Sequence, residues 1–237
     1  MKQFIDDLNK WNIELNDKQL ERFVRYYELL IEWNEKINLT AITDKDDVFK
    51  KHFLDSLSFS QCINNTDLKD KRILDLGTGA GFPGIPLKIL YPATHFTLVD
   101  SLNKRIDFLN LVIDELGLDN ITAIHSRAED LARNAIFREQ YDFVVSRAVA
   151  NLSVLSEYCI PFVKVGGKFI SYKSENALDE IDQARNAIGV LGCKKPNLIM
   201  FSLPNSDLKR VNVSIQKINP TPDIYPRKAG IPSKKPL

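Results

Sequence analysis

The sequence lacks any pattern of paired cysteines. Its three cysteines, Cys62, Cys159 and Cys193, are far apart and odd in number, and no CxxC pair is present. Disulfide frameworks and zinc sites need cysteines at characteristic spacings. We therefore expect buried thiols and no metal site.

Long apolar runs are also missing. No stretch approaches the roughly eighteen uninterrupted apolar residues of a membrane span, and residues 1–7 include two acids where a secretory signal would be apolar. We expect a soluble, cytoplasmic protein without a membrane partner, and a monomer. With 237 residues, 44% of them hydrophobic, the chain can form one sizeable core and a small additional subdomain.

The formal net charge of +1 hides an uneven distribution. From Lys194 to Leu237, nine lysines and arginines stand against two aspartates, so the first 193 residues carry a net negative charge. Positive charge concentrated at one end can bind a polyanion, or it can form a solvated tail that keeps the protein soluble. Charge alone leaves both readings open.

The first 65 residues have a helical pattern. Asn16 and Gln19 have the spacing of a capping box, and apolar residues recur at helical spacing from Leu20 to about Trp33. Shorter helices are predicted before and after it, at 4–11 and 46–62. We predict a helical N-terminal subdomain over residues 1–65 and a second domain over residues 66–237.

From Lys71 onward, short β-rich runs alternate with helical stretches. Such alternation is typical of a parallel sheet with helices on both faces. The last two runs, separated by a turn-rich segment, predict a hairpin at one sheet edge. The predicted strands are 72–76, 96–100, 121–125, 143–146, 168–173, 198–203 and 211–217, and the predicted helices are 85–90, 102–116, 128–138, 152–161 and 177–191.

The first predicted strand leads into a glycine-rich loop, LDLGTGAGFPG, over residues 74–84. In open α/β sheets, ligands bind beyond the carboxyl ends of the strands, where this loop lies. A phosphate-binding P-loop is excluded because Ile85 and Pro86 stand where lysine and serine or threonine are required. The dinucleotide pattern GxGxxG does begin at Gly79, with Asp100 at the appropriate distance, but that pattern alone is weak.

Two prolines indicate where the next helix begins. Pro83 and Pro86 lack amide hydrogens and fit only at or before the first turn of a helix. We therefore expect the helix to start in this region and its free amides to face the ligand.

The acids at the strand ends favour S-adenosylmethionine as the ligand. Asp75 precedes Gly77 by two residues, where a carboxylate can accept hydrogen bonds from an ammonium group but would repel a pyrophosphate. Asp100 ends the second strand and can bind both ribose hydroxyls with its two oxygens. After the third strand, small and polar residues including Ala128 and Glu129 are suited to flank an adenine ring.

The fourth predicted strand ends at Arg147. The Asn/Asp-Pro-Pro-aromatic motif of enzymes that methylate exocyclic amines is absent there, as is the cysteine nucleophile of pyrimidine C5 methyltransferases. A ring nitrogen such as guanine N7 carries a lone pair and no proton, so it needs positioning rather than a general base. Arg147 has three candidate roles: orienting the base, holding a phosphate, or helping to hold the cofactor.

Several stretches together resemble one family. They are 33–42 (WNEKINLTAI), 52–57 (HFLDSL), the glycine loop through Pro86, 98–101 (LVDS) with Lys104 and Arg105, 127–129 (RAE), 146–148 (SRA) and 225–232 (YPRKAGIP). In this combination the sequence resembles the glucose-inhibited division protein B family, the bacterial 16S ribosomal RNA guanine-N7 methyltransferases.

The resemblance implies a class I, Rossmann-like methyltransferase sheet with a helical N-terminal extension and S-adenosyl-L-methionine as cofactor. It also implies N7 methylation of one guanine in the 530-loop region of 16S rRNA, which makes 16S rRNA or the small ribosomal subunit the partner. By family position, the cofactor should contact Gly77, Phe82, Ala128, Glu129 and Arg147. The predicted cofactor site consists of these residues together with Asp75, Gly79, Asp100 and Ser101.

The basic end gains a function from the resemblance. Cations spaced by prolines and a glycine, in an extended segment over about 220–237, can follow an RNA backbone. The predicted RNA-binding residues are Arg227, Lys228, Lys234 and Lys235. For Tyr225 packing is favoured over base stacking, and for His52 and Asp55 structural hydrogen bonds are favoured.

Three other functions stay open on the sequence. One is an NAD-dependent oxidoreductase on a similar sheet, and another is a non-catalytic RNA-binding protein that retains a cofactor pocket. The third is methylation of a protein or a small molecule, which the basic end disfavours.

Overall fold

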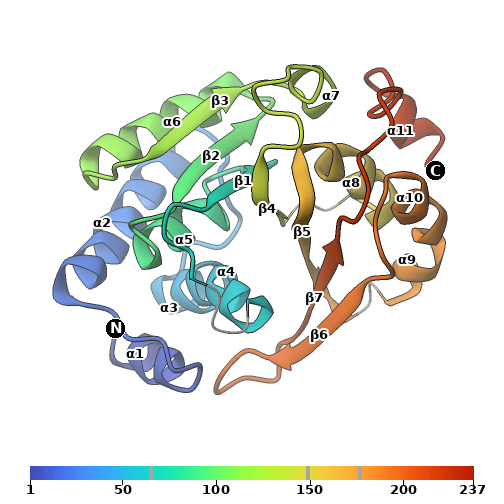
Figure 1. The fold of residues 1–237 in the computed structure, drawn as a ribbon. Helices are drawn as coiled ribbons and strands as arrows, with labels where there is room; N and C mark the ends of the chain where they lie inside the picture. Colours follow the sequence, from blue (N-terminus) through green and yellow to red (C-terminus); the bar gives the residue numbers. More distant parts are fainter. Residues whose placement is uncertain (64–66, 148–149, 176–177) are drawn as a thin grey trace.

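The protein folds around a seven-stranded sheet in the order β3-β2-β1-β4-β5-β7-β6 (Figure 1). The computed structural model describes residues 1–63, 67–147, 150–175 and 178–237. The first five strands are parallel, and β7 runs antiparallel between β5 and β6. The strands are β1 (Arg72–Leu76), β2 (His95–Asp100), β3 (Ile121–His125), β4 (Tyr141–Ser146), β5 (Val163–Ser174), β6 (Asn197–Ser202) and β7 (Lys209–Gln216). The predicted strands and the edge hairpin are confirmed.

Apolar side chains cover both faces of the sheet. In β1, Ile73 belongs to the core on one face and Leu74 to the core on the other, as the alternation of side chains along a strand requires. A parallel sheet needs cover on both faces because its crossover connections lie there. Consecutive residues of one strand therefore belong to opposite cores.

The face that contains Ile73 carries two layers of helix (Figure 1). The inner helices are α5 (Gly84–Leu90) and α6 (Asn103–Glu115), and α2 (Asp17–Asn34) packs over them. The remaining N-terminal elements are α1 (Lys2–Asn9) and an almost continuous helical run made of α3 (Lys45–Val48), the π-helical η1 (Phe49–Leu54), α4 (Asp55–Leu57) and the 3₁₀ turn η2 (Ser58–Cys62).

The N-terminal helices share one core with the sheet. The predicted capping box starts α2: the Asn16 side chain accepts from the Gln19 amide at 2.9 Å, and the Gln19 side chain accepts from the Asn16 amide at 3.0 Å. Phe23 and Phe53 belong to the same buried cluster as the strand residue Phe143. The extension thus forms the outer of the two helical layers on this face. The predicted boundary at residues 65 and 66 lies outside the described ranges.

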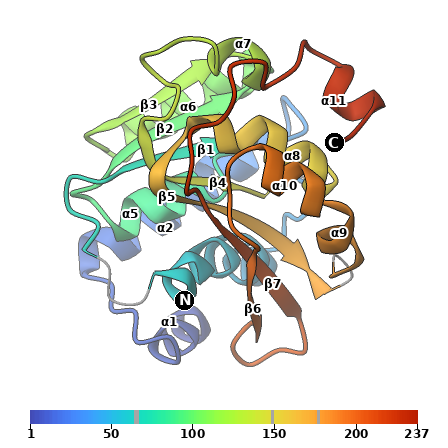
Figure 2. The same ribbon diagram turned by 45° about the vertical axis from the view of Figure 1, so that its right-hand side comes forward.

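Shorter helices cover the second face (Figure 2). They are α7 (Ala128–Leu131), α8 (Leu152–Cys159) with the 3₁₀ turn η3 (Ile160–Phe162), α9 (Leu178–Gln183), α10 (Arg185–Val190) and α11 (Ile231–Lys234). None of the helices in the described ranges is both long and apolar enough to cross a membrane.

Two helix predictions on this face were too long. The helix predicted over 128–138 ends at Leu131, because the following segment turns toward the C-terminal tail. There Arg138 donates to the backbone oxygens of Tyr225 and Thr221 at 2.9 and 2.8 Å. The helix predicted over 177–191 is divided into α9 and α10, and its first predicted residue lies outside the described part of the chain.

Tyr26 of α2 connects the N-terminal layer to the glycine loop. Its hydroxyl donates to the backbone oxygen of Ala80 at 2.5 Å, and its ring stacks on Phe53 with centroids 5.2 Å apart. Its side chain is fully buried. The loop is therefore held from outside the sheet as well as from within it.

We predict that Tyr26→Phe lowers the free energy of unfolding by about 1–3 kcal/mol, because it removes a donor from a buried carbonyl. Urea unfolding followed by circular dichroism measures the change. Tyr27→Phe is the control, since that hydroxyl donates to Thr43 at 3.2 Å from an exposed position, and it should change the value by less than about 0.5 kcal/mol. Equal losses in the two variants would contradict a loop-holding role for Tyr26.

Candidate cofactor site

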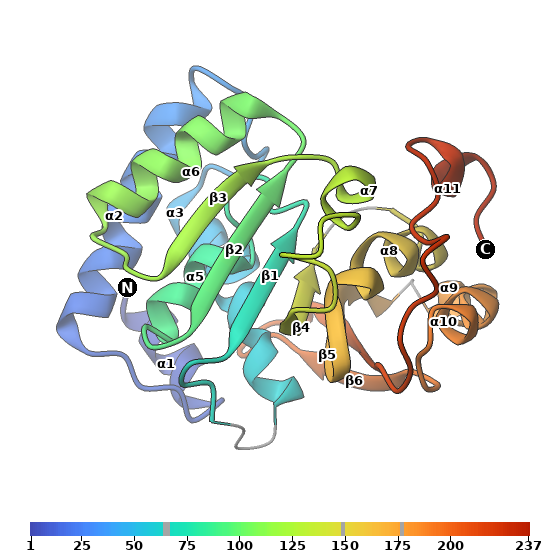
Figure 3. The ribbon, with the colours of Figure 1, turned by 45° about the horizontal axis from the view of Figure 1, so that its top comes forward.

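A cleft of about 370 Å³ lies beyond the carboxyl ends of β1, β2 and β3, at the end of the sheet that α7 flanks in Figure 3. Clefts of this size at this edge of an α/β sheet commonly bind small ligands. Five predicted cofactor residues line it: Gly77, Asp100, Ser101, Ala128 and Glu129. The remaining lining residues are Leu76, Val99, Arg105, Ser126, Arg127, Ala150, Leu155 and Tyr158.

Two buried carboxylates hold the glycine loop beside the cleft. One oxygen of Asp75, Oδ2, accepts from the Gly84 amide at 2.8 Å and from the Thr78 hydroxyl at 2.7 Å. Asp100 accepts from the Gly79 amide at 2.9 Å through Oδ2. The shape of the loop is thus fixed by the protein's own acids before any ligand binds.

Two of the glycines are required for packing rather than for ligand approach. A Cβ on Gly84 would lie 2.3 Å from Leu98 Cδ2 and 2.9 Å from Asp75 Oδ2. Gly81 has φ +103°, and its Cβ would lie 2.6 Å from Ile85 Cγ1. The expectation that the free amides of this helix face the ligand is wrong for Gly84, whose amide is turned to Asp75.

Asp75 keeps one oxygen without a partner. Its side chain is fully buried, and among the described residues Oδ1 has no hydrogen-bond donor. Burial raises the pKa of Asp75 to about 7, although the hydrogen bonds from Thr78 and Gly84 act in the opposite direction. An ammonium group donating to Oδ1 would favour the ionised carboxylate. Asp75 does not line the cleft, so its contact with the methionine end of S-adenosylmethionine stays a prediction.

Arg105 and Tyr158 also line the cleft, and the sequence had assigned neither a role there. The Arg105 guanidinium lies 3.2 Å from Asp100 Oδ2. Its place in the first turn of α6, five residues after Asp100, was a usable signal. Tyr158 lies on α8. Because the position of this helix over the cleft depends on tertiary packing, the sequence contained no signal for Tyr158.

Like Asp75 and Gly79, Phe82 and Arg147 are not among the residues that line this cleft. They lie together in a neighbouring cluster, with the Arg147 guanidinium carbon 4.9 Å from the centre of the Phe82 ring. Arg147 donates to Asp55 Oδ2 at 3.0 Å. A cofactor contact for these two residues stays a prediction. Ala148, the last residue of their motif, lies outside the described ranges.

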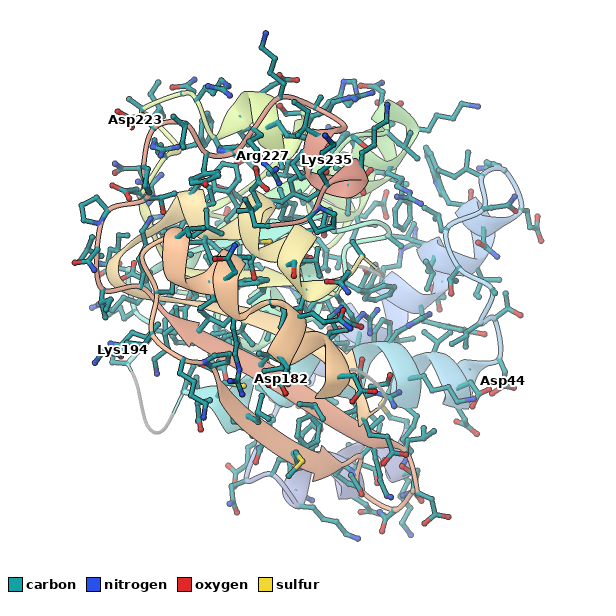
Figure 4. The ribbon with its side chains drawn as sticks, turned by 90° about the vertical axis from the view of Figure 1, so that its right-hand side faces the viewer. Asp44, Asp182, Lys194, Asp223, Arg227 and Lys235 are labelled. Carbon is teal, nitrogen blue, oxygen red and sulfur yellow. The ribbon has the colours of Figure 1, made fainter. Side chains whose placement is uncertain are left out.

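The sequence predicted an extended C-terminal tail, and this is wrong. The tail is folded against the second face. Arg227 turns inward to Glu157, which is fully buried, with its Nε 2.9 Å from Oε1 and its Nη2 2.6 Å from Oε2. Its Nη2 also donates to the backbone oxygen of Lys235 at 2.8 Å (Figure 4). Tyr225 packs against the core of this face.

The tail also reaches the edge of the cleft. The Tyr158 hydroxyl lies 3.0 Å from the hydroxyl of Ser233 in α11. Within the described ranges, Lys228, Lys234 and Lys235 form no ion pair, in contrast to Arg227. The structure thus separates Arg227, which has a buried partner, from the three lysines with which it was predicted to act.

The sequence profile described as "GidB: rRNA small subunit methyltransferase G" matches residues 19–208 of this chain. The chain belongs to the GidB family. Ribosomal RNA small subunit methyltransferase G of Streptococcus gordonii is 49% identical over 237 residues, covering 99% of this chain and 98% of that protein. The protein of the same name from Streptococcus pneumoniae serotype 4 is 50% identical over 238 residues, covering 100% and 99%.

Solved structures support the fold of this GidB-family protein. TYW2 of M. jannaschii, in complex with AdoMet, aligns with a TM-score of 0.52 at 14% identity and covers 69% of this chain and 77% of that one. At this identity the likeness shows the fold alone. The predicted Rossmann-like class I methyltransferase fold is confirmed.

We predict that Asp75 makes the stability of the ligand-free protein depend on pH. Because its folded-state pKa is raised from 3.8 to about 7, its contribution is fully present below about pH 4 and is lost as the pH rises through about 7. The loss is on the order of 4 kcal/mol. Urea unfolding between pH 4 and 8 should show the wild type losing stability relative to Asp75→Asn.

Asp142→Asn provides the opposite control. Burial acts to raise the pKa of Asp142, but the Arg72 amide and Lys164 hold it below the usual value. Its contribution is present above the ordinary pKa of 3.8 and is lost only as the pH falls below that value, so between pH 4 and 8 the wild type and Asp142→Asn should keep a constant difference in stability. Parallel curves for the wild type and Asp75→Asn would show that Asp75 is not the titrating group.

Proposed function

We propose that this protein transfers a methyl group from S-adenosyl-L-methionine to N7 of a guanine in the 530-loop region of 16S ribosomal RNA. The observation that carries the proposal is its membership of the GidB family, with 49% identity to a named small-subunit rRNA methyltransferase over nearly the whole chain. The cleft at the carboxyl ends of β1 to β3, with its buried acids, supports it.

Four of the predicted cofactor residues have specific roles in this proposal. When bound, S-adenosylmethionine supplies an electrophilic methyl group. Asp75 would accept hydrogen bonds from the ammonium group at its unpaired oxygen. Asp100 would accept from the ribose hydroxyls, and Ala128 and Glu129 would flank the adenine ring. Guanine N7 has no proton to lose, so the in-line displacement requires positioning and no general base or metal.

The lysines of the tail provide a surface for the RNA. Lys228, Lys234 and Lys235 lie on a segment that Arg227 anchors to buried Glu157. Ser233, in the same segment, contacts Tyr158 at the cleft. We infer that the tail binds RNA phosphates beside the cofactor, that the partner is 16S rRNA or the small subunit, and that the protein acts as a cytoplasmic monomer.

The direct test is methyl transfer. Ribosomal RNA from cells that lack the protein is incubated with purified protein and labelled S-adenosylmethionine, and the modified nucleotide is mapped. One labelled guanine, methylated at N7 in the 530 loop, is the expected result. RNA binding without label would indicate a non-catalytic RNA-binding protein. Thermal stabilisation by NAD and not by S-adenosylmethionine would indicate an oxidoreductase.

We predict that Asp100→Ala raises the Kd for S-adenosylmethionine by about 10- to 100-fold, because it removes a charged acceptor. Calorimetric titration measures the Kd. Asp107→Ala, at an exposed position of α6, is the matched control and should bind normally. An unchanged Kd in Asp100→Ala would place the ribose elsewhere.

We predict that replacing Lys228, Lys234 and Lys235 with glutamine weakens rRNA binding and leaves the Kd for S-adenosylmethionine unchanged. Three lost phosphate contacts on single-stranded RNA would reduce the slope of log K against log salt by about 2. The control replaces three exposed lysines of the N-terminal half, Lys2, Lys18 and Lys69. An equal effect from both sets would mean that the tail attracts RNA only through the net charge.

A further inference from the structure

Two family motifs of the N-terminal layer have no part in the function described so far. They contain Thr40 in the segment before α3, and His52 and Asp55 in η1 and α4. In the structure all three residues lie in one chain of contacts that ends at Arg147, which follows β4.

Asp55 is a buried carboxylate that joins two arginines. Its Oδ2 accepts from Arg147 Nη1 at 3.0 Å, and its Oδ1 accepts from Arg210 Nε of β7 at 2.8 Å. Only 8% of the Asp55 side chain is exposed. Burying such a cluster requires removing water from three charges, and well-packed apolar side chains often stabilise a fold equally well. The cluster therefore calls for a role beyond stability.

His52 fixes a second edge of the Arg147 guanidinium. Its Nδ1 lies 3.3 Å from Arg147 Nη2, and because a guanidinium has no acceptor, Nδ1 must accept. The ring proton is then on Nε2, which donates to the Thr40 hydroxyl at 2.7 Å. This arrangement needs a neutral ring, and burial together with the Arg147 charge lowers the pKa of His52 to about 4.

The aromatic ring of Phe82 completes the enclosure of Arg147. The guanidinium carbon lies 4.9 Å from the ring centre, and the His52 ring stacks on Phe82 with centroids 4.7 Å apart and planes at 22°. The backbone oxygen of Lys51 accepts from Nη1 at 3.2 Å. Arg147 is thus held through its edges and against a ring, at the sheet edge where ligands of α/β folds bind.

We propose that His52 and Asp55 are positioning residues for methyl transfer, holding Arg147 and Phe82 in the arrangement in which Arg147 meets the acceptor nucleotide. Thr40 supports His52, and Arg210 balances the second oxygen of Asp55. The inference rests on the proposed function. It explains why the N-terminal layer carries polar motifs where simple packing would need only apolar residues.

The test compares Asp55→Asn with Asp7→Asn. Asp7 is another buried carboxylate, which accepts from Lys50 Nζ at 2.6 Å and from Asn205 Nδ2 at 2.6 Å, and neither partner hydrogen-bonds to Arg147, whose contacts are with Lys51, His52 and Asp55. Steady-state methyl transfer to rRNA gives kcat and KM for each variant, and thermal melting reports the loss of stability. Both variants should melt earlier than the wild type.

We expect Asp55→Asn to lower kcat by about 100-fold, because small misplacements at the reacting end have effects of that size. The KM for rRNA should change far less, and Asp7→Asn should keep the wild-type kcat. If Asp55→Asn lowers kcat no more than Asp7→Asn does, the carboxylate is structural and the proposal is overturned.

A milder variant decides the matter if Asp55→Asn does not fold. Thr40→Val keeps the shape of the side chain and removes the hydroxyl that accepts from His52 and from the Ile42 amide, so it should lower kcat with a smaller loss of melting temperature than Asp55→Asn. A wild-type kcat in Thr40→Val would overturn the proposal. A wild-type protein that transfers no methyl group would overturn the proposed function itself, and this inference with it.

Discussion

The candidate cofactor site depends on two buried carboxylates that accept hydrogen bonds from backbone amides of the glycine loop. Asp75 and Asp100 accept the amides of Gly84 and Gly79, so the glycine loop is shaped before a ligand arrives. A Cβ at Gly84 would clash with Leu98 and also with Asp75. The acid that leaves one oxygen open therefore helps to exclude any side chain from the residue that faces it. Preorganisation of this kind lowers the entropy lost on binding.

Around that loop, the N-terminal layer is as much part of the site as the sheet. Tyr26 holds Ala80, His52 stacks on Phe82, and Asp55 binds Arg147. Each contact crosses from a helix of the extension to a residue at the ligand edge of the sheet. Under the proposed function, the extension thus shapes the surface for the substrate, while the cleft is the surface for the cofactor.

The fold could be predicted from local sequence patterns, because strand alternation, helical spacing and the capping box at Asn16 each depend on residues close together in the sequence. The cleft residues Asp100 and Glu129 were predictable for a related reason, since strand ends converge at one sheet edge. What the sequence could not show were partners distant along the chain. The tail around Arg227 was predicted to be extended, since nothing near it in the sequence reveals its partner Glu157, 70 residues earlier; RNA binding by Arg227 itself stays a prediction. The overlong helix at 128–138 had the same origin.

The pairing of Asp55 with Arg210 joins residues 155 positions apart, and the bond between Asp7 and Asn205 spans 198. During synthesis the N-terminal helices leave the ribosome first, yet their buried acids gain these partners only when β7 and the segment before it emerge. Contacts of such long range delay folding until the chain is nearly complete. The bonds that hold Asp55 and Asp7 can consequently be completed only near the end of translation, after the segment that contains Asn205 and Arg210 has been made.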